Sequence, residues 1–303
     1  MLWHIFTYSS IGLCILVTAW RTFRIMRLPI HLRWELAPIP HEKGRNRYGG
    51  SYLEEYEWWN RRRSVSYIAP LIYMAKEILL LNAVRKNNRT LWPFSFSLHM
   101  GIYLTAVTIL LQALSAVLII SASFQALLMS ISEAATLSAL AGYLLGMFGS
   151  VGLLLKRIFD ADLSPFSSFS KYFNLCFLTA IFLTGGIAWL LSENFASEMM
   201  IFIKDVFTFS AGIDISTVTA LHLSLLLLFL IYLPFTDMIH PVIKYFTYHD
   251  IRWNDAPQNR NMQKAVGDLL AQPVTWSASH INADRKTNWV DIVTAENGSE
   301  KKS

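Results

Sequence analysis

Five stretches of the chain are apolar, nearly free of charge and long enough to cross a lipid bilayer as helices. A spanning helix needs about 20 such residues because the hydrocarbon core is about 30 Å thick. Only 16% of the 303 residues are charged and 53% are hydrophobic, which fits a membrane protein. The expected spans are Leu2 to Ala19, Phe94 to Ile120, Leu137 to Leu155, Tyr172 to Leu191, and Thr217 to Pro234, the last continuing to His240. The sequence therefore predicts an all-α membrane protein, a bundle of five transmembrane helices.

A sixth apolar stretch, residues 65–84, is not expected to cross the bilayer. It carries Lys76 and Glu77 at its centre and Pro70 near its start. A charge at the bilayer centre costs roughly 2.5–3.5 kcal/mol on insertion scales. We therefore expect a helix that lies in the membrane interface.

Basic residues indicate the orientation of the spans. They follow the first, third and fifth spans and fill the loop between the first two, whereas the connections 121–136 and 192–216 hold only Lys204. Lysine and arginine favour the cytoplasmic side, so the N-terminus is expected outside and the C-terminus in the cytoplasm, across the inner membrane. The residues that close the three spans are Arg21, Arg24, Arg27, Lys156, Arg157, Lys244 and Arg252.

The cysteines and the net charge exclude several functions. Cys14 and Cys176 lie in apolar segments without a CxxC or CxxCH motif. This excludes an iron–sulfur cluster held by this chain alone, a c-type haem and a disulfide framework. The net charge of +5 follows from the basic connections and suits anionic lipid headgroups, so nucleic acid is not an expected partner.

Three histidines lie within the spans. His222 and His240 are 18 residues apart, which is five turns of an ideal helix, so both are expected on one face of the fifth span, about 27 Å apart along its axis. His99, a few residues into the second span, lies at the depth expected for His240. Two imidazoles that face each other across a bundle can hold a b-type haem. The alternative for each is a buried histidine hydrogen-bonded to a hydroxyl or a carbonyl.

A second haem would need another ligand near His222. The matching position of the second span is Ile109, and residues 105–114 contain no histidine, methionine or lysine. His4, near the outer end of the first span, could pair with His222 if the first span flanks the fifth. Otherwise His222 is hydrogen-bonded in a quinol pocket or simply packed. The remaining histidines are expected at the surface: His31, His41, His249 and His280.

Two further features of the spans have open roles. Gly142, Gly146, Gly149 and Gly152 form a ladder on the third span, which fits either a close approach to a macrocycle or ordinary helix packing. Gln112, deep in the second span, could hydrogen-bond a quinone carbonyl or bridge two helices.

Three motifs occur in a fixed order between residues 90 and 250. Phe96-Ser-Leu-His-Met-Gly101 opens the second span, Lys156-Arg-Ile-Phe-Asp160 follows the third, and Leu233-Pro-Phe-Thr-Asp-Met-Ile-His240-Pro follows His222. Together they resemble the cytochrome b family of the respiratory nitrate reductase gamma subunit. The resemblance implies that His99 and His240 hold an inner haem. It also implies that Ile109 replaces the second-span ligand of an outer haem, for which His222 would be the other ligand.

The loop after the first span resembles one branch of this family. The segments His31–Lys43 and Tyr48–Trp59, with Lys244–His249 and Arg252–Asp255 in the tail, look like the versions found in anaerobes and sulfate reducers. That resemblance implies a heterodisulfide-reductase-like iron–sulfur partner. The alternative is a solvated loop whose tryptophans and tyrosines only anchor it at the interface.

The expected organisation has four parts. Residues 1–25 form the first transmembrane helix, a retained anchor because the basic start and the cleavage site of a signal peptide are missing. Residues 26–93 form a cytoplasmic loop with the interfacial helix, residues 94–240 a four-helix haem-binding core, and residues 241–303 a cytoplasmic tail.

The sequence thus predicts a membrane cytochrome b with haem b as its cofactor. It would transfer electrons between the menaquinone or quinone pool and a cytoplasmic iron–sulfur partner, in either direction. The alternatives are a redox-inert membrane anchor and the cytochrome b of a molybdenum-type nitrate reductase. A transporter is disfavoured, because the chain has neither an internal repeat nor a carboxylate at the midplane of a span.

Overall fold

The computed structural model describes residues 1–28, 44–48, 50, 54–57, 66, 68–121, 125–192, 194–210, 215–249, 260–276 and 285–294. The chain forms two units, Met1–Trp253 and Asn254–Ser303. The second unit contains α11 (Arg260–Leu270) and α12 (Trp289–Thr294). Within it, the rings of Trp276 and Trp289 pack with their centres 5.6 Å apart.

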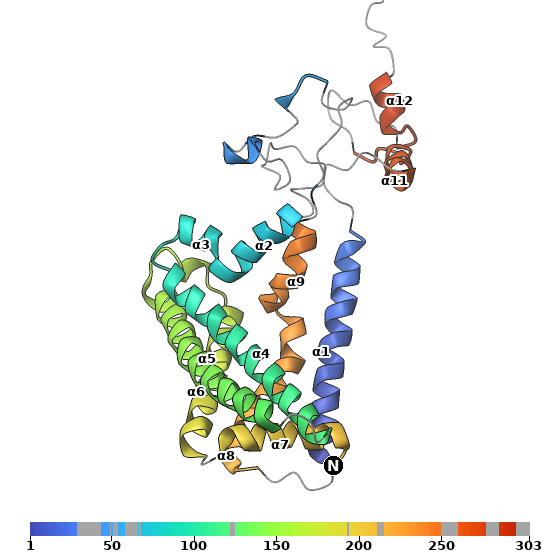
Figure 1. Cartoon of the computed structure of the whole chain (residues 1–303). Coiled ribbons are helices and arrows are strands. Elements are labelled where there is room, and N and C mark those ends of the chain that lie inside the picture. Colours follow the sequence, from blue (N-terminus) through green and yellow to red (C-terminus); the bar gives the residue numbers. More distant parts are fainter. Residues whose placement is uncertain are drawn as a thin grey trace, which may run out of the picture. The chain divides into compact units, whose positions relative to one another are not determined.

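The first unit is a bundle of long apolar helices (Figure 1). Among the described residues, five helices are long and apolar enough to cross a membrane, which confirms the expected number of spans. They are α1 (Leu2–Met26), α4 (Trp92–Ile120), α5 (Gln125–Phe159), α6 (Phe169–Leu191) and α8 (Thr217–Tyr232). Four begin close to their expected positions. The exception is α5, the third expected span. It begins well before Leu137, because the alanine, leucine and methionine residues that precede Leu137 favour a helix.

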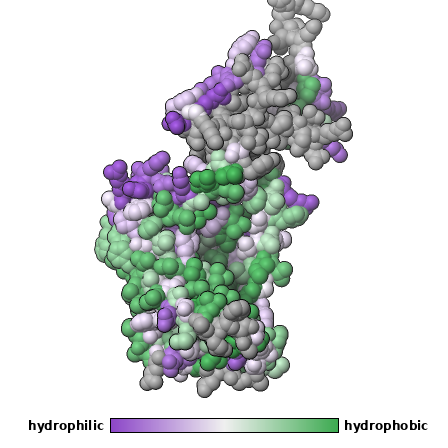
Figure 2. Space-filling view, in the orientation of Figure 1, coloured by the Kyte–Doolittle hydropathy of each residue, from purple (hydrophilic) through white to green (hydrophobic). Residues whose placement is uncertain are grey.

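The surface of the bundle suits a lipid environment. Figure 2 shows apolar residues over its middle and hydrophilic residues gathered at the end that holds α3 (Asn82–Asn87). Large apolar side chains are exposed on α4, α5, α6 and α8, among them Leu110, Leu144, Leu190 and Leu228. Exposed apolar surface of this extent is typical of helices that face lipid. The chain is therefore a multi-pass membrane protein.

Two shorter helices lie between and beside the spans. α2 (Ile68–Leu80) has 13 residues and is about 20 Å long, which is less than the hydrocarbon thickness. This agrees with the expectation that residues 65–84 do not cross, while their place in the interface stays a prediction. α7 (Phe195–Thr208) was not expected and fills most of the connection 192–216. The remaining helical turns of this unit include η1 (Arg45–Arg47), η4 (Ser164–Phe166) and η7 (Tyr245–His249).

Glycines allow α4 and α5 to touch through their backbones (Figure 1). A Cβ atom on Gly101 would lie 2.4 Å from the Cα atom of Gly146, and one on Gly149 would lie 2.2 Å from the backbone nitrogen of Leu98. No larger residue fits at such distances without moving a helix. The glycine ladder of the third span therefore packs against a helix, which is the second of its two interpretations.

The fifth span is interrupted before His240. After α8 the chain continues through three short elements, η5 (Leu233–Phe235), η6 (Asp237–Ile239) and α9 (His240–Lys244). Thr236, between the two turns, has an extended backbone with φ −106° and ψ 178°. The cause is Pro234, which has no N–H and whose ring would collide with the carbonyl group one turn earlier in a straight helix. The expectation that His222 and His240 share one face of one continuous helix is therefore wrong.

Glu198 of α7 joins the end of α6 to the start of α8. One carboxylate oxygen accepts hydrogen bonds from the hydroxyls of Ser216 (2.9 Å) and Thr219 (2.6 Å), and the other accepts from the hydroxyl of Ser192 (2.7 Å). Burial raises the pKa of Glu198, but the hydrogen bonds from Thr219, Ser192 and Ser216 lower it by more, so the pKa lies below its ordinary value of 4.5. The folded chain thus binds this proton more weakly than the unfolded chain does. The carboxylate stabilises the fold above about pH 4.5, and this contribution is lost as the pH falls further.

Gly149→Ala is expected to destabilise the bundle, because the added methyl group would overlap the backbone of α4 at Leu98. Overpacking of this kind costs about 1–3 kcal/mol. Thermal unfolding of the purified protein in detergent measures the loss. Gly12→Ala is the matched control, since Gly12 also lies in a spanning helix and nothing lies within 4 Å of a Cβ atom there. Equal unfolding temperatures for the two variants would contradict the contact.

Glu198→Gln is expected to lower the unfolding temperature at neutral pH. Because a protonated Glu198 resembles glutamine, the difference from the unsubstituted protein should shrink as the pH falls below about 4.5. Thermal unfolding across this pH range in detergent tests it. Glu133→Gln, at an exposed position of α5, serves as the control and should leave the profile unchanged. A difference that is independent of pH would show that the charge of Glu198 does not contribute.

Candidate functional site

His99 and His240 lie next to each other in the folded chain. His99 is on α4, and His240 is the first residue of α9. Their ring centres are 6.1 Å apart, and the ring planes make an angle of 65°. The structure thus brings together the two histidines that the sequence singled out as a pair, while their role as ligands stays a prediction.

Each of the two imidazoles has its Nδ1 atom close to a backbone carbonyl oxygen. The Nδ1 atom of His99 is 2.7 Å from the carbonyl oxygen of Ser95, and that of His240 is 3.2 Å from the carbonyl oxygen of Asp237. A carbonyl oxygen only accepts, so both Nδ1 atoms carry the hydrogen. In the neutral rings the Nε2 atoms are then unprotonated. This is the arrangement of metal-binding histidines, whose second nitrogen donates to a carbonyl or a carboxylate.

The distance between the rings suits two ligands of one iron. An imidazole nitrogen binds a metal at about 2 Å and lies about 1 Å from its own ring centre, so two imidazoles on opposite sides of one iron have ring centres about 6 Å apart. The observed 6.1 Å agrees. In the described part of the chain, no group of three or more histidine, cysteine, aspartate or glutamate residues could hold a metal ion. A pair of histidines suits haem, because the macrocycle supplies the other ligands of the iron.

A cavity of about 240 Å³ adjoins the pair between α2, α4 and α9. Met74 and Ile78 of α2 and Tyr103 of α4 form part of its wall, and Lys244 lies at its edge on α9. Its lining is mixed: apolar and aromatic side chains, the two imidazoles, and the charged side chains of Glu77 and Lys244. The volume is below the range of about 300–1,000 Å³ that is usual for ligand pockets, so the fit to a haem rests on the two imidazoles as its ligands.

Two side chains of α4 hold α2 against this cavity. The hydroxyl of Tyr103 donates to the carbonyl of Ile78 (3.0 Å), and the indole N–H of Trp92 donates to the carbonyl of Leu80 (2.9 Å). Both carbonyls belong to the last turn of α2, where carbonyl groups lack N–H donors from within the helix. This part of the site was not expected from the sequence. Tyr103 follows His99 by one helical turn on the same face, and that spacing could have revealed it.

Polar side chains also support the turn that precedes His240. The hydroxyl of Tyr232 donates to the Oδ1 atom of Asn174 (2.7 Å), and the amide of Asn174 donates to the carboxylate of Asp237 (3.3 Å). The carbonyl of Asp237 is the acceptor for the ring of His240. Asn174 is buried within α6, and a buried polar residue in a span is usually functional. That rule could have pointed to Asn174 from the sequence.

His222 has a different environment. Only 1% of its surface is exposed, and hydroxyl groups lie near both ring nitrogens, that of Tyr143 at 3.2 Å from Nε2 and that of Thr184 at 3.4 Å from Nδ1. The free space beside it, lined by Ile109 and Gln112 among others, is about 10 Å³. Such a space holds about one water molecule. A macrocycle does not fit next to His222 in this arrangement.

His4 is buried where α1 meets α7. Its Nε2 atom is 3.2 Å from the carbonyl oxygen of Asp205, and its ring stacks on Phe209 with the centres 6.1 Å apart. The pairing of His4 with His222 stays a prediction, and the contacts of neither residue support it. Of the histidines expected at the surface, His31, His41 and His280 lie outside the described residues, and His249 ends η7.

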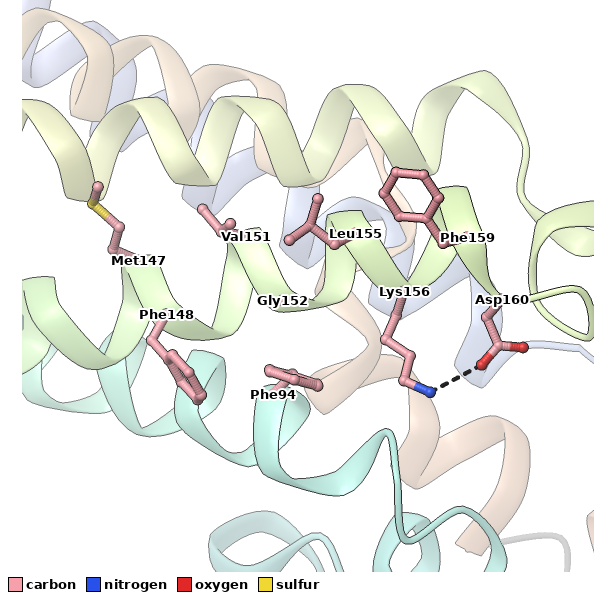
Figure 3. A pocket seen from close by; sticks show the side chains of 9 residues that line it. All are labelled: Phe94, Met147, Phe148, Val151, Gly152, Leu155, Lys156, Phe159 and Asp160. Carbon is pink, nitrogen blue, oxygen red and sulfur yellow. Dashed lines mark hydrogen bonds and ion pairs between the residues drawn. The ribbon is translucent and has the colours of Figure 1, made fainter.

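Another groove of the bundle is separate from all these histidines. It has a volume of about 720 Å³ and runs along α5 from Met147 to Phe159 and on to Asp160, with Phe94 of α4 on its other side (Figure 3). Its polar groups are confined to one end, where Lys156 and Asp160 form an ion pair with an N–O distance of 3.0 Å. The groove thus offers mainly hydrocarbon surface, and none of the described residues that line it is a histidine or a cysteine.

Comparison with known proteins identifies one family. A model of the nitrate reductase gamma subunit family matches residues 83–254, which is more than half of the chain. The matched range includes α4 to α9, and with them His99, His222 and His240, but it excludes α1 and α2. No curated protein and no solved structure matches the chain.

Proposed function

Because the chain belongs to the nitrate reductase gamma subunit family, whose members are membrane cytochromes b that take part in electron transfer, we propose that His99 and His240 bind one haem b. The observation that carries the proposal is the pair of imidazoles with ring centres 6.1 Å apart, each with its Nδ1 atom bonded to a backbone carbonyl. His222 differs, because a hydroxyl group lies near each of its ring nitrogens. One imidazole would bind each side of the iron.

Bound haem supplies a carrier that takes up and releases one electron at a time. The carbonyls of Ser95 and Asp237 keep a hydrogen on each Nδ1 atom, which fixes the ring orientation and leaves Nε2 available. Met74 and Ile78 of α2 add apolar side chains to the wall of the cavity. An apolar wall of this kind is one of the means by which a protein sets a redox potential.

This proposal does not include the outer haem for which the family resemblance would make His222 a ligand. Its second-span ligand is replaced by Ile109, and the hydroxyls of Tyr143 and Thr184 occupy the nitrogens of His222. The space beside His222 is too small for a macrocycle. We therefore infer one haem for each chain.

On this proposal the chain transfers electrons between menaquinone, or another quinone, in the bilayer and a cytoplasmic iron–sulfur partner. Support comes from the family, whose members associate with other redox subunits, and from the basic, tryptophan-rich loop after the first span. Tryptophan, tyrosine and arginine dominate the binding energy of protein interfaces. The resemblance of this loop favours a heterodisulfide-reductase-like partner over a molybdenum enzyme. The positive-inside pattern favours a position in the inner membrane with this loop and the tail in the cytoplasm.

His99→Ala and His240→Ala are each expected to abolish the same haem signal, because a bis-histidine site needs both ligands. The measurement is a reduced-minus-oxidised spectrum of the purified protein with pyridine-haemochrome quantitation. His280→Ala is the control and should leave the signal unchanged. Loss in only one of the two variants would mean that the pairing is wrong. A wild-type protein without haem would leave only the redox-inert membrane anchor.

His222→Gln is expected to leave the haem content at about one for each chain. Glutamine can still bond to the hydroxyls of Tyr143 and Thr184 but cannot replace an axial imidazole. The same haem quantitation, with the unsubstituted protein as reference, decides the question. Two haems in the unsubstituted protein and one in the variant would show that His222 binds a second haem.

A further inference from the structure

The segment between α8 and α9 departs from regular helical hydrogen bonding. Pro234 contributes no N–H group, and Thr236 is extended. At membrane depth, irregular backbone is tolerated only where it is buried in protein or lines a water-filled cavity. Hydrogen-bond donors from a neighbouring element can therefore stabilise this segment.

Arg21 of α1 supplies these donors. One guanidinium nitrogen of Arg21 donates to the carbonyl of Pro234 and to that of Thr236, the latter at 3.1 Å. α1 contacts α8, η5 and α9, and Figure 1 shows it running beside them. A guanidinium group carries its N–H donors in a fixed plane, so it can hold two neighbouring carbonyls in a defined geometry.

The other arginines of α1 make different contacts. Arg24 lies over the ring of Trp20 at 5.1 Å, and Arg27 lies over the ring of Phe23 at 4.7 Å. Both are exposed, whereas Arg21 is half-buried. Membrane orientation needs only positive charge near the end of a span, and Arg24 and Arg27 provide it. The buried bonds of Arg21 therefore need a separate explanation.

The carbonyls held by Arg21 immediately precede the turn that orients His240. The hydroxyl of Thr236 accepts a hydrogen bond from the N–H of Met238 (3.1 Å) and so starts η6. The carbonyl of Asp237, the next residue, accepts the hydrogen of the His240 ring (3.2 Å). A shift of the Thr236 peptide would thus pass through η6 to the imidazole.

We propose that Arg21 is a positioning residue, which sets the orientation of the His240 imidazole relative to that of His99 by holding the carbonyls of Pro234 and Thr236. The inference rests on the proposed function, because it concerns two ligands of one haem. α1 lies outside residues 83–254, so the family match does not include this residue.

Arg21→Gln tests the proposal, with Arg24→Gln as the matched control. Both variants remove one positive charge from the same end of α1, but only the first removes the bonds to the unwound segment. The first readout is the low-spin EPR spectrum of the oxidised haem, which depends on the angle between the two imidazole planes. The second is amide hydrogen exchange at Thr236 and Met238, which does not require haem.

In Arg21→Gln we expect a shifted or broadened EPR spectrum and exchange at Thr236 and Met238 that is about tenfold faster, because a charge-assisted hydrogen bond is lost. Arg24→Gln should match the unsubstituted protein in both readouts. Unchanged EPR spectrum and exchange in Arg21→Gln would overturn the proposal. If the unsubstituted protein binds no haem, the proposed function fails, while the exchange measurement still decides whether Arg21 holds the segment.

Arg21→Lys is the second test variant, for use if Arg21→Gln does not yield folded protein in the membrane. Lysine keeps the positive charge that orients α1, but its ammonium lies on a flexible stem and lacks the fixed plane of the guanidinium donors, so it holds the two carbonyls in a less defined geometry. We expect this variant to insert normally and to shift the EPR spectrum in the same direction by a smaller amount. A wild-type EPR spectrum together with wild-type exchange in Arg21→Lys would also overturn the proposal.

Discussion

A peptide carbonyl inside a membrane protein needs a hydrogen-bond donor, and this requirement governs the segment between α8 and α9. Regular helix ends before Pro234, and the guanidinium of Arg21 donates to the carbonyls of Pro234 and Thr236. Asn174 adds a bond to Asp237 from α6. α9 begins at His240 as a new helix. The direction of this imidazole is therefore determined by the preceding turn η6 and its side-chain partners. It does not follow from the helical spacing between His222 and His240. The candidate site therefore depends on how this interruption is supported.

Much of the fold could be predicted because the spans dominate the hydropathy of the sequence. The start of α5 and the whole of α7 were missed, since Glu133 and Glu198 lower the local hydropathy and only the spans were sought. The packing glycines were recognised as a ladder, but their partner was not, because the sequence does not show that Gly146 lies against Gly101. Contacts between distant segments arise only once the helices are packed.

The candidate site was predicted for reasons that hold only in part. His99 and His240 were paired because each lies near the same end of its span, and the structure has them adjacent. The argument from an unbroken helix between His222 and His240 was wrong, although Pro234 was visible as its cause. The contributions of α2 and Arg21 involve backbone carbonyls as acceptors or a wall of ordinary apolar residues, which carry no residue pattern. The features that suggested the partner, in the segment His31–Lys43, lie outside the described residues.

The glycine contacts between α4 and α5 have a consequence for His99 itself. Leu98, the residue before it, lies against Gly149, and Gly101, two residues after it, lies against Gly146. At these two contacts backbone packs directly against backbone, and no side chain lies between them that could move aside. The position of α4 is therefore fixed on both sides of this histidine. If His99 holds a haem as proposed, its imidazole would keep its position when the charge on the iron changes. Little rearrangement of the protein would then accompany each oxidation or reduction.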